Sequence, residues 1–368
     1  MTNTAVIAAA IQRPKGRGTE AAGVQVELLT DWAQAAGRWD WSQGASGGAT
    51  FQDPCWLRAW YGALTGSNVT PLIALVSNAV TGERLALLPL IRRRHRGIRI
   101  VEFADRDLTD NNAPLMTTAA HDPAATGTAM WHALRKALRR ADGGADLLRL
   151  RKMPFEMDGA ANPLAYVSAA RPCSLNGNLV VTGDDFEAHR FARGRNERSQ
   201  LKRKWRAFMQ EPAAAFEVVT RRDQALRVLA TIARQQETRM RELGQRYVLN
   251  DDTNAAFYRN LVSDGFDRGY VVLTTLSAGG EIVAATLGLR RGRRWTLIRN
   301  SMGEARWLKY SPGILLIDQT MAALHQDGVR EFDFSIGNYA YKRRLGATAV
   351  PLANLSAALS WRGAPFAL

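Results

Sequence analysis

Cysteine is scarce in this chain, and its scarcity excludes two classes of protein. Only Cys55 and Cys173 occur among 368 residues, which is too few for a disulfide scaffold or a cysteine-rich zinc module. The histidines are scattered and never take a ligand spacing such as His-Glu-x-x-His, so we expect no metal site. So little cysteine suits a reducing compartment, and we therefore expect a cytoplasmic protein.

Long apolar runs are also missing. No run approaches the roughly 20 residues that a membrane helix needs. Residues 1–22 mix Ala, Gly, Thr and basic residues without aromatic ones, and their basic residues follow the short apolar stretch instead of preceding it. This composition predicts a disordered basic tail and argues against a secretory signal. Order is expected to begin at Val24, where the sequence alternates like a strand.

Negative charge is in short supply. Lys and Arg number 49 against 34 Asp and Glu, which leaves a formal net charge of +15. An excess of this size favours polyanionic partners, such as nucleic acid, anionic lipid, or a phosphorylated substrate or cofactor. An arginine-rich proteome would produce part of the same excess without any partner. Charge alone therefore names no function.

The pattern of strands and helices predicts two α/β units in tandem. In each half, apolar alternation and amphipathic periods give the order β-α-α-β-β-β-α-β. Residues 23–173 are predicted to form an N-terminal domain and residues 174–368 a C-terminal domain. The expected fold class is α/β (α+β), with mixed central sheets flanked by helices.

The best candidate for an anion site is the start of a helix near residue 311. Ser311 is a suitable N-cap, Pro312 a suitable first helical residue, and Gly328 a natural stop. Free backbone N–H groups at a helix N-terminus bind phosphate readily, and Lys309 could add a donor. A well-capped core helix with nothing bound would show the same local sequence.

A second candidate is the run FDFSIGNYAYKRRLG, which follows that helix. If Phe332 and Phe334 face the core, Asp333 points the other way. A cluster of cations that includes Lys342 comes shortly after it. A buried carboxylate beside such a cluster is expected to have a perturbed pKa, as catalytic groups often have. A structural ion pair that fixes the loop would give the same sequence pattern.

Together these two stretches resemble the C-terminal signature of the GNAT-superfamily acetyltransferases grouped with CelD, the cellulose-biosynthesis type. That signature reads Tyr-Ser-Pro-Gly-x-Leu-Leu, then Gly-x-x-x-Phe-Asp-Phe, then Arg-Gly-Asp-Glu-x-Tyr-Lys-x-x-x-Gly. FQDPCWLRAWYGAL, LLRLRKMP and RNERSQLKRKWRAF resemble segments upstream in the family. The resemblance spans roughly residues 24–350. A more distant similarity connects the chain to the Fem peptidyltransferases, which also pair two GNAT-like domains.

The resemblance implies two GNAT-like units, an acyl-CoA donor such as acetyl-CoA, and transfer to an amine or hydroxyl. The acceptor would be a sugar, a polysaccharide precursor or an amino compound. By position, Lys342 would stabilise the developing negative charge, and Asp333 and Tyr341 are our candidates for acid–base work. The residues that would hold the cofactor's pyrophosphate are Lys309, Tyr310, Ser311, Gly313 and Ile314. The pantetheine arm would run beside the preceding strand, RWTLIRNSM, which begins at Arg294.

The chain departs from the family where it has Asn338 and Tyr339 in place of an Asp-Glu pair. Two carboxylates are therefore missing. This departure keeps a degenerate GNAT scaffold in envelope-polysaccharide biosynthesis open as an alternative. An aminoacyl-tRNA-dependent Fem-like ligase is the alternative within enzymes.

Upstream of the signature, the sequence from Phe186 to Pro212 is predicted to be helical without a break. It is a basic helix, with seven Lys or Arg among residues 193–206. It could touch RNA, lipid or an acidic glycan, or it could be a solvated linker helix. We expect at most a weak contact with an anionic surface, and nucleic acid is the less favoured partner. We predict that one face of this helix packs against the protein, and that face consists of Leu201, Trp205, Phe208 and Met209. The opposite face is predicted to be an exposed ridge that CoA binding does not need, formed by Arg195, Arg198, Lys202 and Arg203.

Residues 107–115 form a polar loop that resembles a family loop and could face the acceptor.

Overall fold

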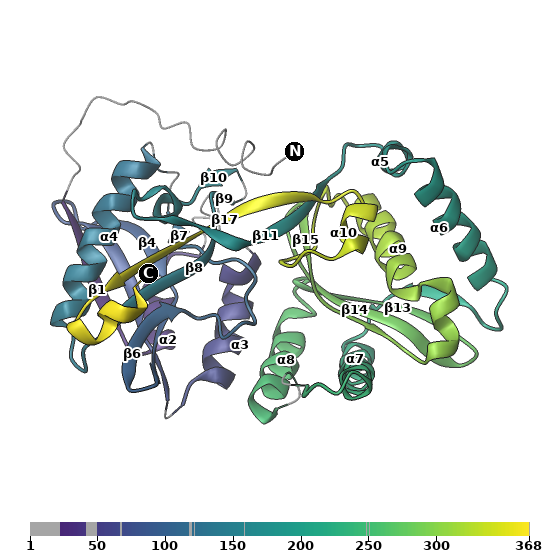
Figure 1. Cartoon of the computed structure of the whole chain (residues 1–368), viewed down its shortest axis with the longest axis horizontal. Coiled ribbons are helices and arrows are strands. Elements are labelled where there is room, and N and C mark those ends of the chain that lie inside the picture. The colour runs from purple at the N-terminus through teal and green to yellow at the C-terminus, as the bar shows by residue number, and fades with distance from the viewer. Residues whose placement is uncertain are drawn as a thin grey trace. The chain divides into compact units, whose positions relative to one another are not determined.

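The fold is described from a computed structural model (Figure 1). The structure describes residues 23–41, 50–66, 68–117, 120, 122–157, 159–247, 249 and 251–367. The tail predicted to be disordered, residues 1–22, lies outside the described residues.

The chain divides into two compact units. The chain passes from unit 1 to unit 2 between Asn176 and Gly177, within strand β11 (Arg171–Val181). Residues 54–64 belong to unit 2, and the C-terminal residues 350–368 return to unit 1.

Unit 1 is built on mostly antiparallel strands around a Leu-rich core, with β6 and β8 as a parallel pair. One sheet has the order β1-β3-β4-β7, and β8, β6, β5 and β2 are hydrogen-bonded neighbours in another. Helix α4 begins at Pro123 because Asp122 caps it, with Oδ1 accepting from the Ala125 N–H at 3.0 Å. Its buried face, which includes Trp131 and Leu134, packs into the core. The other elements of unit 1 are β1 (Val24–Leu29), α2 (Trp32–Gly37), β2 (Val69–Pro71), β3 (Ile73–Asn78), β4 (Arg84–Leu88), β5 (Leu90–His95), β6 (Ile98–Phe103), β7 (Leu115–Met116), α4 (Pro123–Arg140), β8 (Leu147–Pro154), β9 (Glu156–Met157) and β10 (Ala160–Ala161).

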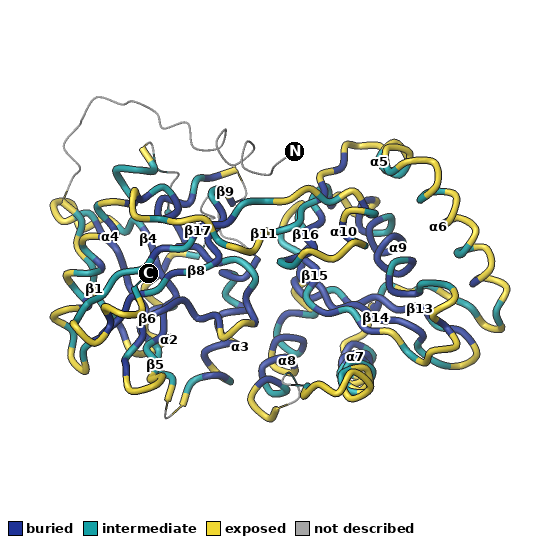
Figure 2. Tube along the Cα trace, in the orientation of Figure 1, coloured by how far each residue is buried: buried dark blue, intermediate teal, exposed yellow. Residues whose placement is uncertain are grey.

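Unit 2 carries helices on both faces of one sheet, whose strand order is β12-β13-β14-β15-β16-β11. Helix α9 covers one face, and α7 and α8 cover the other (Figure 1). Buried stretches of the chain lie along the sheet and its helices (Figure 2). The core includes the side chains of Trp295 and Phe332. The elements are α3 (Pro54–Leu64), α5 (Phe186–Ala192), α6 (Arg195–Phe208), β12 (Ala215–Val218), α7 (Arg222–Glu242), α8 (Asp252–Gly265), β13 (Val271–Ala278), β14 (Glu281–Arg291), β15 (Arg294–Met302), α9 (Pro312–Gln326), β16 (Glu331–Asp333) and α10 (Ala340–Arg344). Strand β17 (Thr348–Ala358) lies mostly in unit 1, where it pairs with β8.

When the strands β2, β5 and β7 are set aside, the same order of elements occurs twice along the chain. Strand β1, helices α2 and α3, strands β3, β4 and β6, helix α4 and strand β8 form the first series. The second series runs β12, α7, α8, β13, β14, β15, α9 and β16. This repeat has the predicted order, but its second copy begins at β12 and not at the strand near residue 174. Strand β11 and helices α5 and α6 come before it.

The basic segment forms two helices, whereas the sequence predicts one long helix from residue 186. Gly194 separates α5 from α6 and has a φ of 89°, a left-handed conformation that interrupts a right-handed helix. On α6, Leu201 and Phe208 are buried as predicted, but Met209 is 39% exposed because it already lies past the helix end. The ridge is exposed at most of the predicted positions (Figure 2); Arg198 is half-buried, with its guanidinium 3.8 Å from the ring centroid of Phe191.

Candidate functional site

Strands β15 and β16 of unit 2 pair in parallel over a short distance and then separate. The last paired residues are Thr296 and Asp333, where β16 ends while β15 continues to Met302. Strand β15 also has a bulge, because the consecutive residues Leu287 and Gly288 of β14 face Arg299 and Leu297, which leaves Ile298 as an extra residue. The end of β15 is therefore free of a parallel neighbour and locally reshaped, next to the start of α9.

Helix α9 begins at Pro312, close against the end of β15. A Cβ atom on the buried Gly313 would lie 3.1 Å from both Asn300 Nδ2 and Met302 Sδ, so a glycine permits this close approach. The N-terminus of a helix of this length carries about half a positive charge and favours an anion. The predicted helix start and the predicted glycine thus meet the strand that the resemblance assigns to the pantetheine arm.

Ser311 precedes this helix but does not cap it as predicted. Its φ is 56°, and its side chain makes no capping hydrogen bond. Instead, Lys204 of α6 donates to the Ser311 hydroxyl, with Nζ 2.5 Å from Oγ. Lys204 was not singled out in the sequence, because it lies in a run of cations whose members look alike. The structure brings this one amine to the N-terminus of α9.

The other predicted phosphate-binding residues flank that point. The Lys309 side chain is 65% exposed, and its Nζ lies 3.6 Å from Glu211 Oε1. The Tyr310 hydroxyl donates to the same carboxylate. Ile314 is half-buried and packs against the core. Lys309 and Tyr310 therefore share an acidic partner, whereas Ser311 and Gly313 lie at the helix terminus itself.

Asp333 is buried at the end of β16, between Phe332 and Phe334, which face the core as predicted. Burial raises the pKa of its carboxyl group, against the opposing effect of Arg294 and of the Ser335 N–H, which donates to Asp333 Oδ1 at 2.7 Å. The perturbed pKa expected from the sequence is thus present, with desolvation as its main cause.

The β16 exit loop, residues 334–337, is held from several directions. Lys342, which is 2% exposed, donates from Nζ to the Ile336 carbonyl at 2.6 Å and to the Ser335 carbonyl at 3.2 Å. Asn178 of β11 donates to the carbonyls of Ser335 and Gly337 at 2.8 and 3.0 Å. Ser335 has a φ of 62°, and its hydroxyl donates to the Leu297 carbonyl of β15 at 2.8 Å. These bonds fix the loop to the two strands that separate here.

Tyr341 is half-buried on α10, and burial raises the pKa of its phenol to about 12. Its ring stacks on that of Tyr339, with centroids 6.2 Å apart. At neutral pH the phenol therefore keeps its proton and can donate a hydrogen bond.

The polar loop 107–115 of unit 1 is tied down by a buried ion pair. Lys152 donates to Asp105 Oδ1 at 2.8 Å and to the Thr109 carbonyl at 2.5 Å. Asn112 donates to Asp105 Oδ2 at 3.0 Å. Burial raises the pKa of Asp105 despite this pairing. These contacts explain the conformation of the loop.

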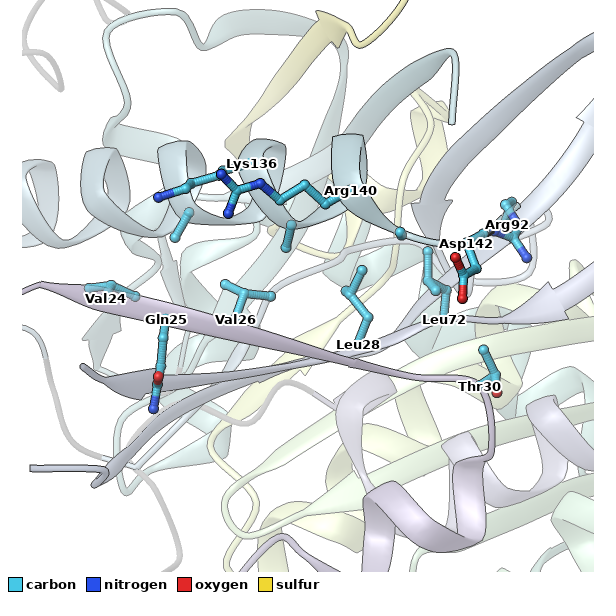
Figure 3. A pocket seen from close by; sticks show the side chains of 13 residues that line it. Val24, Gln25, Val26, Leu28, Thr30, Leu72, Arg92, Lys136, Arg140 and Asp142 are labelled. Carbon is cyan, nitrogen blue, oxygen red and sulfur yellow. Dashed lines mark hydrogen bonds between the residues drawn. The ribbon is translucent and has the colours of Figure 1, made fainter. Parts of the chain in front are cut away.

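Unit 1 also contains a cavity of about 570 Å³ between β1 and α4 (Figure 3). Val26 and Leu28 of β1 line one side, and Lys136 and Arg140 of α4 project over it (Figure 3). At one end, Arg92 Nη1 donates to the Asp142 carbonyl at 2.7 Å. None of the lining residues is among the predicted site residues.

Residues 195–343 match the acetyltransferase (GNAT) domain family. The matched segment contains α9, Asp333 and Lys342, and it spans less than half of the chain. A search of curated proteins finds none that matches this chain.

Solved structures share the fold over most of the chain. The crystal structure of FemX is 10% identical, with a TM-score of 0.60, covering 89% of this chain and 96% of that one. A conserved protein of unknown function from Bacteroides thetaiotaomicron is 11% identical, with a TM-score of 0.52, covering 83% and 90%. A tandem GNAT protein from the clavulanic acid biosynthesis pathway is 14% identical, with a TM-score of 0.47, covering 92% and 99%.

The predicted fold class is confirmed, because the chain forms two α/β units with mixed sheets and flanking helices, and the FemX structure shares this fold. The GNAT acetyltransferase domain match at residues 195–343 supports the predicted acyltransferase class. Membership of the CelD group specifically stays a prediction. Within the part of the chain that the structure describes, no helix is long and apolar enough to span a membrane.

Proposed function

We propose that this protein transfers an acyl group, in the first instance acetyl, from acyl-CoA to an amine or hydroxyl of a small molecule or glycan precursor. One observation carries the proposal: within the GNAT domain, β15 and β16 separate after Thr296 and Asp333, and α9 begins beside the unpaired end of β15. An unpaired strand edge next to a positive helix terminus suits an extended ligand with an amide-containing arm and a phosphate end.

The donor would bind with its pyrophosphate at the start of α9. Gly313 and Ser311 supply the backbone there, and Lys204 brings an ammonium group to the Ser311 hydroxyl. Lys309, Tyr310 and Ile314 form the flanks of this subsite. The pantetheine arm would then follow β15 toward the point where it separates from β16.

The chemistry would take place beside the β16 exit loop. The acceptor loses a proton to a base, for which Asp333 is the candidate because its raised pKa brings it closer to neutral pH. The acceptor attacks the thioester carbonyl, the C–S bond breaks, and the proton that Asp333 accepted passes to the leaving thiolate. Tyr341, whose phenol keeps its proton, is the candidate to donate a hydrogen bond to the leaving sulfur. Lys342 would contribute its positive charge and hold the loop in place.

The test combines acetyl-CoA binding by calorimetry with acyl transfer measured as thiol release. Lys204→Ala should weaken CoA affinity about 10-fold, as expected for losing one charged hydrogen bond of about 1.5 kcal/mol. Lys202→Ala is the matched control, since Lys202 is exposed on the same helix. If acetyl-CoA does not bind the wild-type protein, the proposal is wrong. If both variants lose affinity equally, the assignment of the subsite is wrong.

A Fem-like, aminoacyl-tRNA-dependent ligase is the second candidate. The exposed cations of α6, among them Arg195, Lys202 and Arg203, favour it because RNA backbones are polyanionic. Transfer from charged tRNA in the absence of CoA, weakening steeply with salt, would establish this alternative. Acetyl-CoA binding without transfer to any acceptor would instead support a scaffold that has lost catalysis.

A further inference from the structure

Arg299 is a buried cation on β15, three residues beyond the last parallel pair of the strand. It is 3% exposed, and its Nε donates to Gln236 Oε1 of α7 at 2.9 Å. Its Nη2 donates to the Tyr247 hydroxyl. The guanidinium carbon lies 4.6 Å from the ring centroid of Tyr258 on α8. Arg299 therefore belongs to the face of the sheet that α7 and α8 cover.

The partners of Arg299 are all neutral. No carboxylate among the described residues lies within ion-pair distance of Arg299, and its Nη1 makes no hydrogen bond to a described residue. Arg193, the other deeply buried arginine of unit 2, differs because it pairs with Asp318. Since buried arginines are almost always paired, the positive charge of Arg299 lacks its usual counter-ion.

The neighbours hold the guanidinium in a fixed orientation. Gln236 donates from Nε2 to the Asn300 carbonyl at 3.0 Å, so its Oε1 is turned toward Arg299. The Tyr247 hydroxyl donates to that same Oε1 while accepting from Arg299. An arginine held this way, with one nitrogen free of protein partners, is prepared for a charged ligand group.

The position of Arg299 on the sheet suits contact with the acyl acceptor. Asn300, the next residue of β15, contacts Gly313 on the α9 side, where the donor is proposed to bind. Arg299 faces the opposite side, and about 10 Å of strand separates it from the point where β15 and β16 part, at about 3.3 Å per residue. That distance is on the scale of a small metabolite.

We propose that Arg299 binds an anionic group, a carboxylate or a phosphate, on the acyl acceptor, so that this enzyme selects acidic acceptors. The inference rests on the proposed function for the identity of the ligand. The inference that an anion binds here rests on the positive charge of Arg299, which has no carboxylate partner among the described residues.

The first test uses Arg299→Met, which keeps an unbranched apolar side chain in place of the aliphatic part of arginine and removes the charge. Tyr247 still satisfies Gln236 Oε1 in this variant, so no acceptor is orphaned. The melting temperature is followed in sodium acetate, sodium phosphate and sodium chloride at constant ionic strength. We expect acetate or phosphate to raise the melting temperature of the wild type, and the response to be lost in Arg299→Met without loss of stability in chloride. Arg227→Met, an exposed arginine of α7, should respond like the wild type.

The acetate and phosphate arms distinguish the two kinds of anion. A strongly destabilised Arg299→Met that keeps the anion response would overturn the proposal, because Arg299 would then serve the fold alone. A wild type that responds to neither anion would overturn it as well.

The second test measures acetyl transfer to paired amines, 4-aminobutyrate against its amide and glucosamine 6-phosphate against glucosamine. We expect the wild type to prefer the charged member of a pair, and Arg299→Met to raise KM for that member about 10- to 100-fold while leaving the neutral member unchanged. Equal use of both members by the wild type contradicts the inference. If no acetyl-CoA binds but the anion response still depends on Arg299, the proposed function fails and the anion site stands.

Discussion

Lys342 offers the most direct test of how the site is built. Replacing it by methionine keeps most of the side-chain volume but leaves the carbonyls of Ser335 and Ile336 without the donor they now share. An orphaned buried polar group costs about 1–3 kcal/mol, and the Ser335 carbonyl retains Asn178 as a second donor. We therefore expect a loss of about 1–3 kcal/mol in the free energy of unfolding, mainly from Ile336.

Turnover should fall further than stability alone explains. Removing one preorganised cationic group beside a developing oxyanion costs about 10²–10³-fold in rate. Affinity for CoA should change little, because that charge appears only in the transition state. The measurements are urea denaturation, calorimetry with acetyl-CoA, and thiol release at saturating donor. Arg343→Met is the matched control, since this neighbouring side chain is exposed and bonds only to Asn338 among the described residues.

Two results would refute this reasoning. Unchanged stability in Lys342→Met would show that the ammonium does not hold the exit loop. A loss of CoA affinity with turnover kept at saturation would make Lys342 a phosphate ligand, not a group that acts on the acyl carbonyl.

Three further predictions concern other parts of unit 2 and unit 1. Gly313→Val should weaken CoA binding and cost about 1–3 kcal/mol in stability, because the new side chain overpacks against β15, and denaturation and calorimetry report the two effects separately. Burial and the neighbouring Arg193 lower the pKa of His189 to about 4, below its ordinary 6.5, so the folded state binds fewer protons than the unfolded state. The free energy of unfolding should therefore decrease as the pH falls from about 6.5 to about 4, and His189→Gln should make it less dependent on pH in that range. The hydrogen bond from Arg99 holds the pKa of Asp146 well below its usual range, so Asp146 contributes to stability above about pH 4 and this contribution is lost on acidification. Asp146→Asn should lower the melting temperature at pH 7 and make the melting temperature decline less at acid pH.

The architecture could be predicted because its signals are local. Alternating strands, capped helices and turn glycines specify each element through neighbouring residues, and the order of elements then follows. The break at Gly194 was missed, since a glycine flanked by strong helix formers reads as a tolerated interruption. Its left-handed φ depends on how α5 and α6 pack, which no local pattern encodes.

The site was predictable only in part because its contacts join distant segments. Asp333, Gly313 and Lys342 lie in one recognisable stretch, but the bonds that define their roles come from elsewhere. Asn178 reaches the exit loop from more than 150 residues away, and Lys204 reaches Ser311 from more than 100. Long-range hydrogen bonds of this kind leave no periodicity in the sequence.

The two carboxylates that this chain lacks, relative to the family that its sequence resembles, also take on a different meaning in the structure. Asn338 and Tyr339, which replace them, are exposed at the start of α10, and Asn338 accepts a hydrogen bond from Arg343. A carboxylate at an exposed position keeps a nearly ordinary pKa, because its surroundings do little to change its acidity. Asp333 and Tyr341, by contrast, have pKa values raised by burial. Acid–base chemistry at neutral pH is favoured by pKa values of about 7, so the shift of Asp333 moves that carboxyl toward the range of a useful base, whereas the shift of Tyr341 moves the phenol away from neutral pH and suits it to donating a hydrogen bond.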